Sequence, residues 1–151
     1  MVERFGFFAV VGRPNVGKSS LVNRLIGEKV SITSRRPQTT RNRVLGVRTQ
    51  GAAQIVFVDT PGMQAGTHGL DYLINETAKS SARSADIIGM MIDARGWHER
   101  DDQVLEYISY LQLPTYLLIN KTDLLHSAAL VLPVIASVSE KYSFTEILPV
   151  S

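Results

Sequence analysis

The 151-residue sequence contains no cysteine, a single tryptophan and no apolar run of the length that a membrane helix needs. The lack of cysteine excludes a disulfide scaffold, thiolate zinc sites and a cysteine nucleophile. The first eleven residues carry Glu3 and Arg4 and are followed by no small-residue cleavage site, so they are interpreted as a strand and not as a secretion signal. With 44% hydrophobic and 20% charged residues, the chain fits one compact domain, and the cytoplasm is its expected location.

Short apolar runs alternate with segments of helical periodicity. Strands are expected at Phe5–Val11, Arg43–Thr49, Ile55–Val58, Ile87–Ile92, Thr115–Ile119 and Ile147–Val150. Helices are expected at Ser20–Ile26, Leu70–Arg83, Asp101–Leu111 and Ala128–Tyr142, with Pro133 either kinking the last helix or lying in its first turn. Gly51 indicates a hairpin. The pattern predicts an α/β fold with a doubly wound, mostly parallel six-stranded sheet, one antiparallel strand and helices on both faces. Ligands of such sheets bind at the carboxyl ends of the strands.

The residues after the first predicted strand match the phosphate-binding pattern G-x-x-x-x-G-K-[ST]. They are Gly12, Arg13, Pro14, Asn15, Val16, Gly17, Lys18 and Ser19, with Ser20 next. Glycines let successive amides converge on phosphate oxygens, and the N-terminus of the following helix adds its dipole. Lys18 can then reach the β- and γ-phosphates, and the Ser19 hydroxyl can bind Mg²⁺. The alternative, a glycine turn with an incidental lysine, is disfavoured by the position between a strand and a helix.

The third predicted strand is followed by Asp59, Thr60, Pro61, Gly62 and Met63. A carboxylate at this position can hold Mg²⁺ through a water molecule. The backbone amide of Gly62 can face the γ-phosphate because no side chain intervenes. A simple Pro-Gly turn is the alternative, and the preceding phosphate-binding pattern makes a nucleotide site the favoured interpretation.

The fifth predicted strand is followed by Asn120, Lys121, Thr122 and Asp123. An ionised carboxylate suits guanine, whose N1–H and exocyclic amine are adjacent donors, whereas adenine would leave it unpaired. Asp123 therefore predicts selection of GTP over ATP. The stem of Lys121 can cover the base, and Asn120 can either bond the purine edge or brace the phosphate loop. The alternative is a polar helix entry capped by Asp123.

A stretch with little periodicity, 27–42, contains Thr39 and Thr40. A threonine there can bind Mg²⁺ only when a γ-phosphate is present, so the stretch is interpreted as a switch that hydrolysis releases. Thr40 is favoured over Thr39 as the metal ligand. The residues expected to act on the γ-phosphate are Lys18, Thr40 and Gly62.

Five segments together resemble the Era family of translation-factor-related GTPases. They are GRPNVGKSSLVNRL at Gly12–Leu25, SITS at Ser31–Ser34, PQTTR at Pro37–Arg41, DTPG at Asp59–Gly62 and NKTD at Asn120–Asp123. The first segment alone would fit Der or TrmE-type GTPases equally well, and the second and third point to Era. The choice of Thr40 as metal ligand agrees with the family pattern.

The resemblance implies a Ras-like P-loop fold, Mg²⁺-dependent hydrolysis of GTP to GDP, and a role in assembling the small ribosomal subunit on 16S rRNA. Family members continue into a KH-type RNA-binding domain. Residues 1–151 are therefore expected to be the G domain alone, monomeric and without 16S rRNA or 30S binding of its own. A Ser-Ala motif that contacts guanine would begin at Ser151, which predicts weaker nucleotide binding than in a longer chain. Peripheral contact with the inner face of the cell membrane is left open.

Many Ras-like enzymes orient the attacking water with a glutamine where this sequence has Met63, and a thioether is a weak acceptor. Hydrolysis is therefore expected to be slow. The resemblance suggests Asn15 as a ligand for K⁺ in place of an arginine finger, the alternative being an asparagine that only braces the turn. Two other functions remain as alternatives. An adenine-nucleotide kinase is disfavoured because Asp123 suits guanine. A nucleotide-binding module that scarcely hydrolyses GTP is compatible with Met63.

The remaining candidate residues carry weaker signals. Trp97 is expected to pack against the protein, and the three histidines lack the spacing of metal ligands. A cluster of arginines is interpreted as a solvated loop face, with contact to rRNA phosphates or to the nucleotide as alternatives. The cluster comprises Arg35, Arg36, Arg41 and Arg43.

Overall fold

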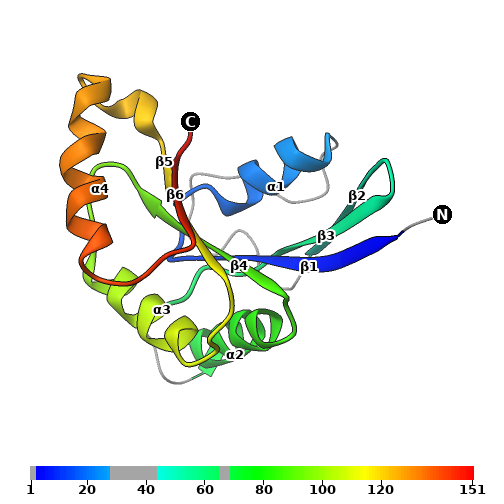
Figure 1. The fold of residues 1–151 in the computed structure, drawn as a ribbon. Coiled ribbons are helices and arrows are strands. Elements are labelled where there is room, and N and C mark those ends of the chain that lie inside the picture. The colour runs from blue at the N-terminus through cyan, green and yellow to red at the C-terminus, as the bar shows by residue number, and fades with distance from the viewer. Residues whose placement is uncertain (1–2, 28–43, 65–68) are drawn as a thin grey trace.

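The computed structural model of the protein describes residues 3–27, 44–64 and 69–151. Apart from one pair of consecutive strands, the second and the third, strands alternate with helical segments along the chain (Figure 1). They are β1 (Arg4–Val11), α1 (Lys18–Ile26), β2 (Val44–Gln50), β3 (Ala53–Asp59), α2 (Gly69–Arg83), β4 (Ile87–Asp93), α3 (Glu99–Ser109), β5 (Thr115–Asn120), α4 (Val131–Ser139) and β6 (Glu146–Pro149). Two 3₁₀ turns, Thr122–Leu124 and Ala128–Leu130, lie between β5 and α4.

The strands form one six-stranded sheet in the order β2-β3-β1-β4-β5-β6. The pairs β3-β1, β1-β4, β4-β5 and β5-β6 are parallel, and only β2 runs antiparallel to its neighbour β3. The predicted fold class is therefore confirmed. The register places Asp59 beside Val10, and Asp93 beside Asn120, so the polar residues that end the strands gather at one edge of the sheet.

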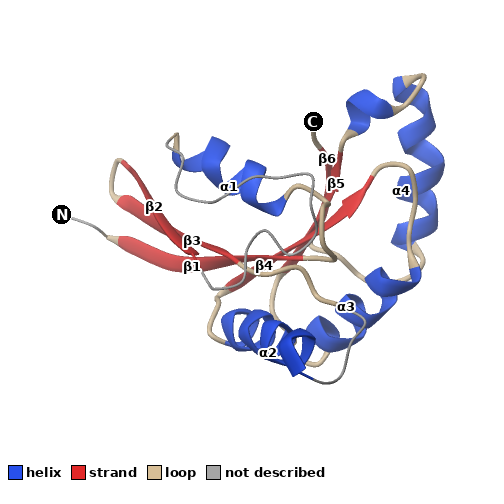
Figure 2. Ribbon diagram, turned by 180° about the vertical axis from the view of Figure 1, so that it is seen from behind, coloured by secondary structure: helices blue, strands red, loops and turns tan. Residues whose placement is uncertain are grey.

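Helices cover both faces of the sheet, with α1 on one side and α2 and α3 on the other (Figure 2). Under α1 the core contains Val10, Val22 and Met91. Beneath α2, α3 and α4 a larger cluster of fully buried side chains includes Ala78, Val104 and Val138, one from each of these helices. Apolar strand residues thus meet helices on both faces, which is the burial that their continuous apolar runs predicted.

The predicted helix Ala128–Tyr142 is wrong in its extent. Ala128–Leu130 forms a 3₁₀ turn, and α4 covers only Val131–Ser139. Pro133 is the third residue of α4, so it lies in the first turn and does not kink the helix. A proline is tolerated there because the first amides of a helix have no acceptor within it. The other boundaries differ from the prediction by one or two residues, and Arg43 lies outside the described residues.

Within the described parts of the chain, every helix is too short or too polar to cross a lipid bilayer.

Candidate nucleotide-binding site

The predicted phosphate loop connects the end of β1 at Val11 to the start of α1 at Lys18. Gly17 caps the helix in the left-handed region, with φ 107°. A Cβ atom at this position would collide with the side-chain amide of Asn120. Glycine therefore fits for two reasons: the backbone conformation and the lack of space. The loop ends directly at a helix N-terminus, as a phosphate-binding loop requires.

The Lys18 side chain folds back into the loop. Its Nζ donates a hydrogen bond of 2.8 Å to the carbonyl oxygen of Arg13, and the residue is only 6% exposed. Burial lowers the pKa of Lys18 to about 8, and the nearby carboxylate of Asp59 opposes this shift. The loop thus encloses a desolvated ammonium group, and a polyphosphate placed there would supply the missing negative charge.

Ser19 and Asp59 meet at the start of α1, as their proposed joint role with Mg²⁺ requires. The Ser19 hydroxyl donates to Asp59 Oδ2 at 2.6 Å. Asp59 is fully buried, and its other oxygen, Oδ1, has no hydrogen-bond partner among the described residues. A buried carboxylate oxygen without a donor suits a hard cation such as Mg²⁺. No set of three His, Asp or Glu side chains in the described residues could hold a metal, so phosphate oxygens and water would complete the shell.

The segment from Asp59 to Met63 is attached to the phosphate loop. The buried hydroxyl of Thr60 donates to the carbonyl of Val10 at 2.7 Å, and the amide of Met63 donates to the carbonyl of Gly12 at 3.0 Å. A Cβ atom on Gly62 would lie 2.6 Å from the backbone of Pro14. The close approach of these two segments therefore depends on Gly62. Met63 is buried in the core, so its thioether packs against apolar side chains.

Asn120 and Lys121 brace the phosphate loop from β5. Asn120 donates through Nδ2 to the carbonyl of Val16 at 2.8 Å, which is the bracing alternative of the sequence interpretation. Lys121 donates through Nζ to the carbonyl of Asn15 at 2.6 Å. Two consecutive residues at the end of β5 thus hold two consecutive carbonyls of the loop.

A residue that the motifs did not include, Asp93 at the end of β4, supports Lys121. The Asp93 carboxylate lies 3.4 Å from the Lys121 ammonium and accepts two hydrogen bonds from the guanidinium of Arg95. These bonds with Arg95 hold the pKa of Asp93 well below its usual range. Its position directly after a buried strand was the one available sequence signal.

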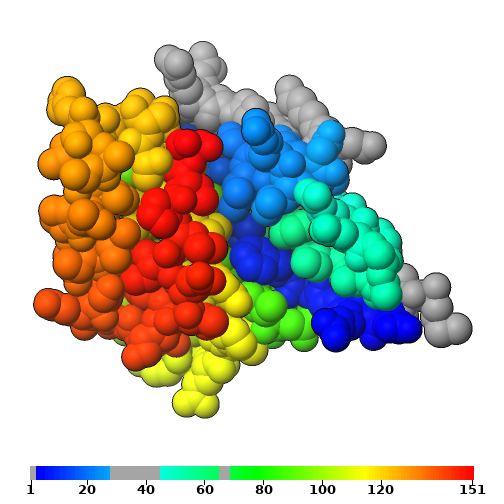
Figure 3. Space-filling model, turned by 45° about the horizontal axis from the view of Figure 1, so that its top comes forward, coloured from blue at the N-terminus to red at the C-terminus, as the bar shows by residue number. Residues whose placement is uncertain are grey.

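Asp123 is exposed in the 3₁₀ turn Thr122–Leu124 that follows Lys121. The hydroxyl and the amide of Thr122 both donate to the carbonyl of Val150, at 3.0 and 3.3 Å. The next residue, Ser151, is exposed. Figure 3 shows the red C-terminal segment beside the blue segment that contains α1. The predicted base-binding and phosphate-binding residues therefore lie at the same edge of the molecule.

Several predicted residues cannot be compared with the structure. Thr39, Thr40 and the four clustered arginines lie outside the described residues.

Three other predicted residues are described. Asn15 is exposed in the loop, and Ser20 is exposed in the first turn of α1. Trp97 packs against the core and donates to Asp102 at 2.8 Å, in keeping with the expected packing role.

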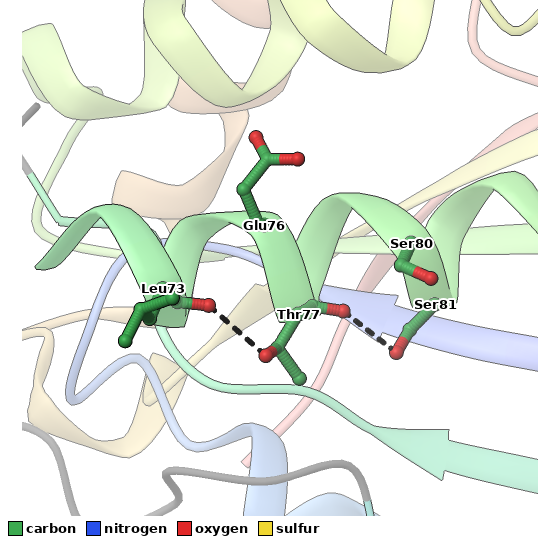
Figure 4. Close-up of a pocket in the computed structure, with 5 residues that line it drawn as sticks. All are labelled: Leu73, Glu76, Thr77, Ser80 and Ser81. Atoms are coloured by element: carbon green, nitrogen blue, oxygen red, sulfur yellow. Dashed lines mark hydrogen bonds between the residues drawn. The ribbon is translucent and has the colours of Figure 1, made fainter. Parts of the chain in front are cut away.

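A separate hollow of about 490 Å³ lies against α2. Figure 4 shows the side chains of α2 that line it. The hydroxyls of Thr77 and Ser81 that line it donate to carbonyls of their own helix, at 3.0 and 2.9 Å. Leu73, Glu76 and Ser80 complete the lining. None of these residues belongs to the predicted motifs, and the hollow is assigned no role.

Comparison with known proteins agrees with this geometry. The sequence profile of the family described as 50S ribosome-binding GTPase matches residues 7–121. GTPase Era of Marinobacter nauticus is 44% identical over 150 residues, which are 99% of this chain and 49% of that protein. GTPase Era of Coxiella burnetii is 45% identical over 147 residues, covering 97% of this chain and 50% of that protein.

Solved structures give the same result. A crystal structure of Era in complex with MgGDPNP and nucleotides 1506–1542 of 16S ribosomal RNA matches with a TM-score of 0.92 and 45% identity. A variant of Aquifex aeolicus Era bound to GDP and AlF4⁻ matches with a TM-score of 0.91 and 45% identity. Each alignment covers 97% of this chain and 50% of the other.

The chain spans about half the length of the curated relatives it matches. The family profile, in contrast, matches most of the chain. This chain therefore belongs to the 50S ribosome-binding GTPase family, and the predicted resemblance to Era is confirmed.

Proposed function

We propose that this chain binds guanine nucleotides together with Mg²⁺ and hydrolyses GTP to GDP and phosphate as a slow molecular switch. The observation that carries the proposal is that the ends of two other strands, β3 and β5, meet the loop that follows β1. Lys121 holds the carbonyl of Asn15, Asp59 holds Ser19, and Met63 holds Gly12. Similar Era structures contain MgGDPNP or GDP with AlF4⁻, which supports the same ligands here.

Asp123 is proposed to select the base. Its exposed carboxylate can accept hydrogen bonds from the N1–H and the exocyclic amine of guanine, and adenine offers no such pair. The Lys121 ammonium is already fixed between Asn15 and Asp93, so its aliphatic stem is held and can cover the base. Asp123 would therefore provide the guanine selectivity, and Lys121, which the phosphate loop holds, would cover the base.

Ser19 and Asp59 are proposed to hold Mg²⁺, joined by Thr40, which lies outside the described residues. Bound Mg²⁺ neutralises charge that develops on the β- and γ-phosphate oxygens. Lys18 adds a second positive charge from the loop, and the amide of Gly62 can donate to the γ-phosphate. These groups would stabilise the transferred γ-phosphoryl group and the GDP that leaves, while none of them orients the attacking water.

Slow hydrolysis follows from Met63, whose buried thioether cannot orient a water molecule. We propose that K⁺, bound beside the exposed Asn15, supplies the positive charge that an arginine finger provides in other GTPases. GTP turnover by the same preparation in K⁺ and in Na⁺ tests this role. Faster turnover in K⁺ supports it, and equal rates refute it.

We further propose that residues 1–151 are the G domain of a longer protein that adds a KH-type domain and acts on 16S rRNA during 30S assembly. An Era relative was crystallised with nucleotides of 16S ribosomal RNA, and relatives are about twice as long. The G domain is proposed to be a cytoplasmic monomer, with membrane contact only peripheral. Cosedimentation of the 30S subunit with the longer protein, but not with this chain, is the expected result, and cosedimentation with neither would refute the rRNA role.

A second function, nucleotide binding with negligible hydrolysis, is favoured by the buried position of Met63. Single-turnover measurements with GTP and with ATP on one preparation separate the alternatives. GTP cleavage without ATP cleavage supports the proposed GTPase, and tight GTP binding without cleavage supports the binding module. Equal use of ATP contradicts both.

A further inference from the structure

We propose that Asp101, in the first turn of α3, is a positioning residue for the phosphate loop and acts through Arg13. The inference rests on the proposed function, since it assigns a device that prepares the loop for a polyphosphate. Asp101 belongs to none of the nucleotide-binding motifs, and its place in the chain is 88 residues from Arg13.

The contact joins the β1 side of the loop to helix α3. Arg13 Nε lies 3.2 and 3.3 Å from the two carboxylate oxygens of Asp101. The Asp101 side chain is completely buried, whereas that of Arg13 is 21% exposed. A carboxylate so deeply buried is costly without a cation, so the fold holds Arg13 against it.

The position of Asp101 is fixed independently of the loop. Its carboxylate accepts a hydrogen bond of 2.8 Å from the backbone amide of His98, and the His98 ring accepts one from the amide of Arg100. Together these bonds form a capping box at the start of α3. The helix therefore holds the carboxylate, and the carboxylate in turn holds Arg13.

The held arginine bears the carbonyl that receives the loop lysine. Arg13 O accepts from Lys18 Nζ at 2.8 Å, and the preceding carbonyl, that of Gly12, accepts from the amide of Met63 at 3.0 Å. A shift of the Arg13 backbone would displace the ammonium that is proposed to meet the β- and γ-phosphates. Asp101 thus acts on the ligand through two steps, first Arg13 and then Lys18.

The loop needs such outside support because its backbone is unusual. Asn15 has φ 64°, in the left-handed region, which asparagine tolerates better than most residues with a side chain but which still costs free energy. Asn120 holds the carbonyl of Val16 and Lys121 holds that of Asn15. Asp101 supplies a further anchor, on the β1 side of the loop.

The substitution Asp101→Asn tests the inference, because it keeps the size of the side chain and an oxygen for the His98 amide but removes the charge that holds Arg13. We expect the dissociation constant for fluorescent GDP, measured with Mg²⁺ on the 151-residue chain, to rise about tenfold, as is common when a supporting partner of a ligand-binding group is removed. In the Arg13→Met background the same substitution is expected to add no further loss.

The matched control is His98→Ala, which removes the side-chain half of the helix cap and leaves Asp101 and Arg13 intact. We expect its thermal stability to fall and its affinity for GDP to stay that of the unsubstituted chain. Equal losses of affinity in Asp101→Asn and His98→Ala would contradict the inference, because the start of α3 alone would then explain both.

The remaining outcomes are also decisive. If the unsubstituted chain does not bind GDP, the proposed function itself fails. If the unsubstituted chain binds GDP and a folded Asp101→Asn variant binds it equally well, only the inference fails. The same holds if the losses of affinity caused by Asp101→Asn and Arg13→Met are additive. Should Asp101→Asn not fold, Arg13→Lys keeps a charge opposite Asp101 but changes its geometry, and it is expected to weaken GDP binding; unchanged affinity in that variant would overturn the inference.

Discussion

At the scale of single residues, Gly17 shows how little freedom the phosphate loop has. Its φ of 107° is unfavourable for any residue with a side chain, and the space where a Cβ atom would lie is taken by the amide of Asn120. Asn120 in turn holds the carbonyl of Val16. A methyl group at position 17 would therefore strain the backbone and also displace one anchor of the loop.

Gly17→Ala is expected to weaken binding of GDP more than tenfold and to lower the free energy of unfolding by about 1–3 kcal/mol. Titration with GDP and urea denaturation measure the two effects. Gly27→Ala is the matched control, because Gly27 also has a positive φ, 86°, but no atom of the described residues lies within 4 Å of the place that its Cβ would take. Gly27→Ala should lower the free energy of unfolding and leave the affinity for GDP unchanged. An equal loss of GDP affinity in both variants would contradict the role assigned to the loop geometry.

The motif residues could be predicted because each follows a strand within one short segment, as Lys18 and Asp59 do. Asp93 is indicated only by its place directly after a predicted strand, and its contact with Lys121 could not be predicted. Asp101 has no such signal, because its partner Arg13 is far away in the sequence. A single carboxylate with a distant partner leaves no local pattern. Only the fold reveals the pairs, because it brings the end of β4 to that of β5 and the first turn of α3 to the loop after β1.

At the scale of elements, a helix cap explains why α3 begins two residues before the predicted start. The helix predicted from Asp101 begins at Glu99, since His98 is its N-cap and Asp101 closes the capping box. Histidine is not among the residues that usually signal a helix start. Apolar periodicity located the helix, but it could not locate a cap of unusual composition.

The pair that joins α3 to the loop also predicts a pH dependence of stability. Burial raises the pKa of Asp101, and Arg13 opposes that rise. When the pKa of a carboxyl group is higher in the folded than in the unfolded state, the free energy of unfolding falls as the pH rises from the unfolded-state pKa to the folded-state pKa. Without Arg13 the pKa of Asp101 rises further, so the loss of stability extends over a wider pH range.

Arg13→Met should therefore lower the free energy of unfolding by about 3 kcal/mol at neutral pH, where Asp101 would be a buried and unpaired charge. The loss should shrink as the pH falls toward about 4, because protonation removes that charge. Urea denaturation of the ligand-free protein across this pH range measures it. A loss that is the same at every pH would mean that the Asp101 charge is not what Arg13 compensates.

At the scale of the whole molecule, one sheet with helices on both faces places every described site residue at the carboxyl edge of its strands. The fold class could be predicted because the central strands are continuous apolar runs, which need cover on both faces. Bracing of the loop from β5 is one of two alternatives for Asn120, and the sequence alone could not decide between them, since the contact depends on the order β1-β4-β5 in the sheet. Sequence patterns define strands and leave open which strands are neighbours.

The larger core lies under α2, α3 and α4, so its integrity should determine the stability of the entire chain. Ile108 is fully buried in α3, and Ile108→Ala is expected to lower the free energy of unfolding by about 2–5 kcal/mol. Leu132 on α4 is 63% exposed, and Leu132→Ala should change stability by no more than about 0.5 kcal/mol. Equal losses of stability for Ile108→Ala and Leu132→Ala in urea denaturation would contradict a core centred under these helices.

The central claim is that the chain is a guanine-nucleotide site in which Asp123 reads the base while the loop around Lys18 holds the phosphates. The most direct measurement is calorimetric titration with GTP and with ATP in the presence of Mg²⁺, on the unsubstituted chain and on Asp123→Asn. We predict that GTP binds at least about 100-fold more tightly than ATP, and that Asp123→Asn loses most of this preference. Equal affinity for the two nucleotides, or a preference that survives in Asp123→Asn, would contradict the account.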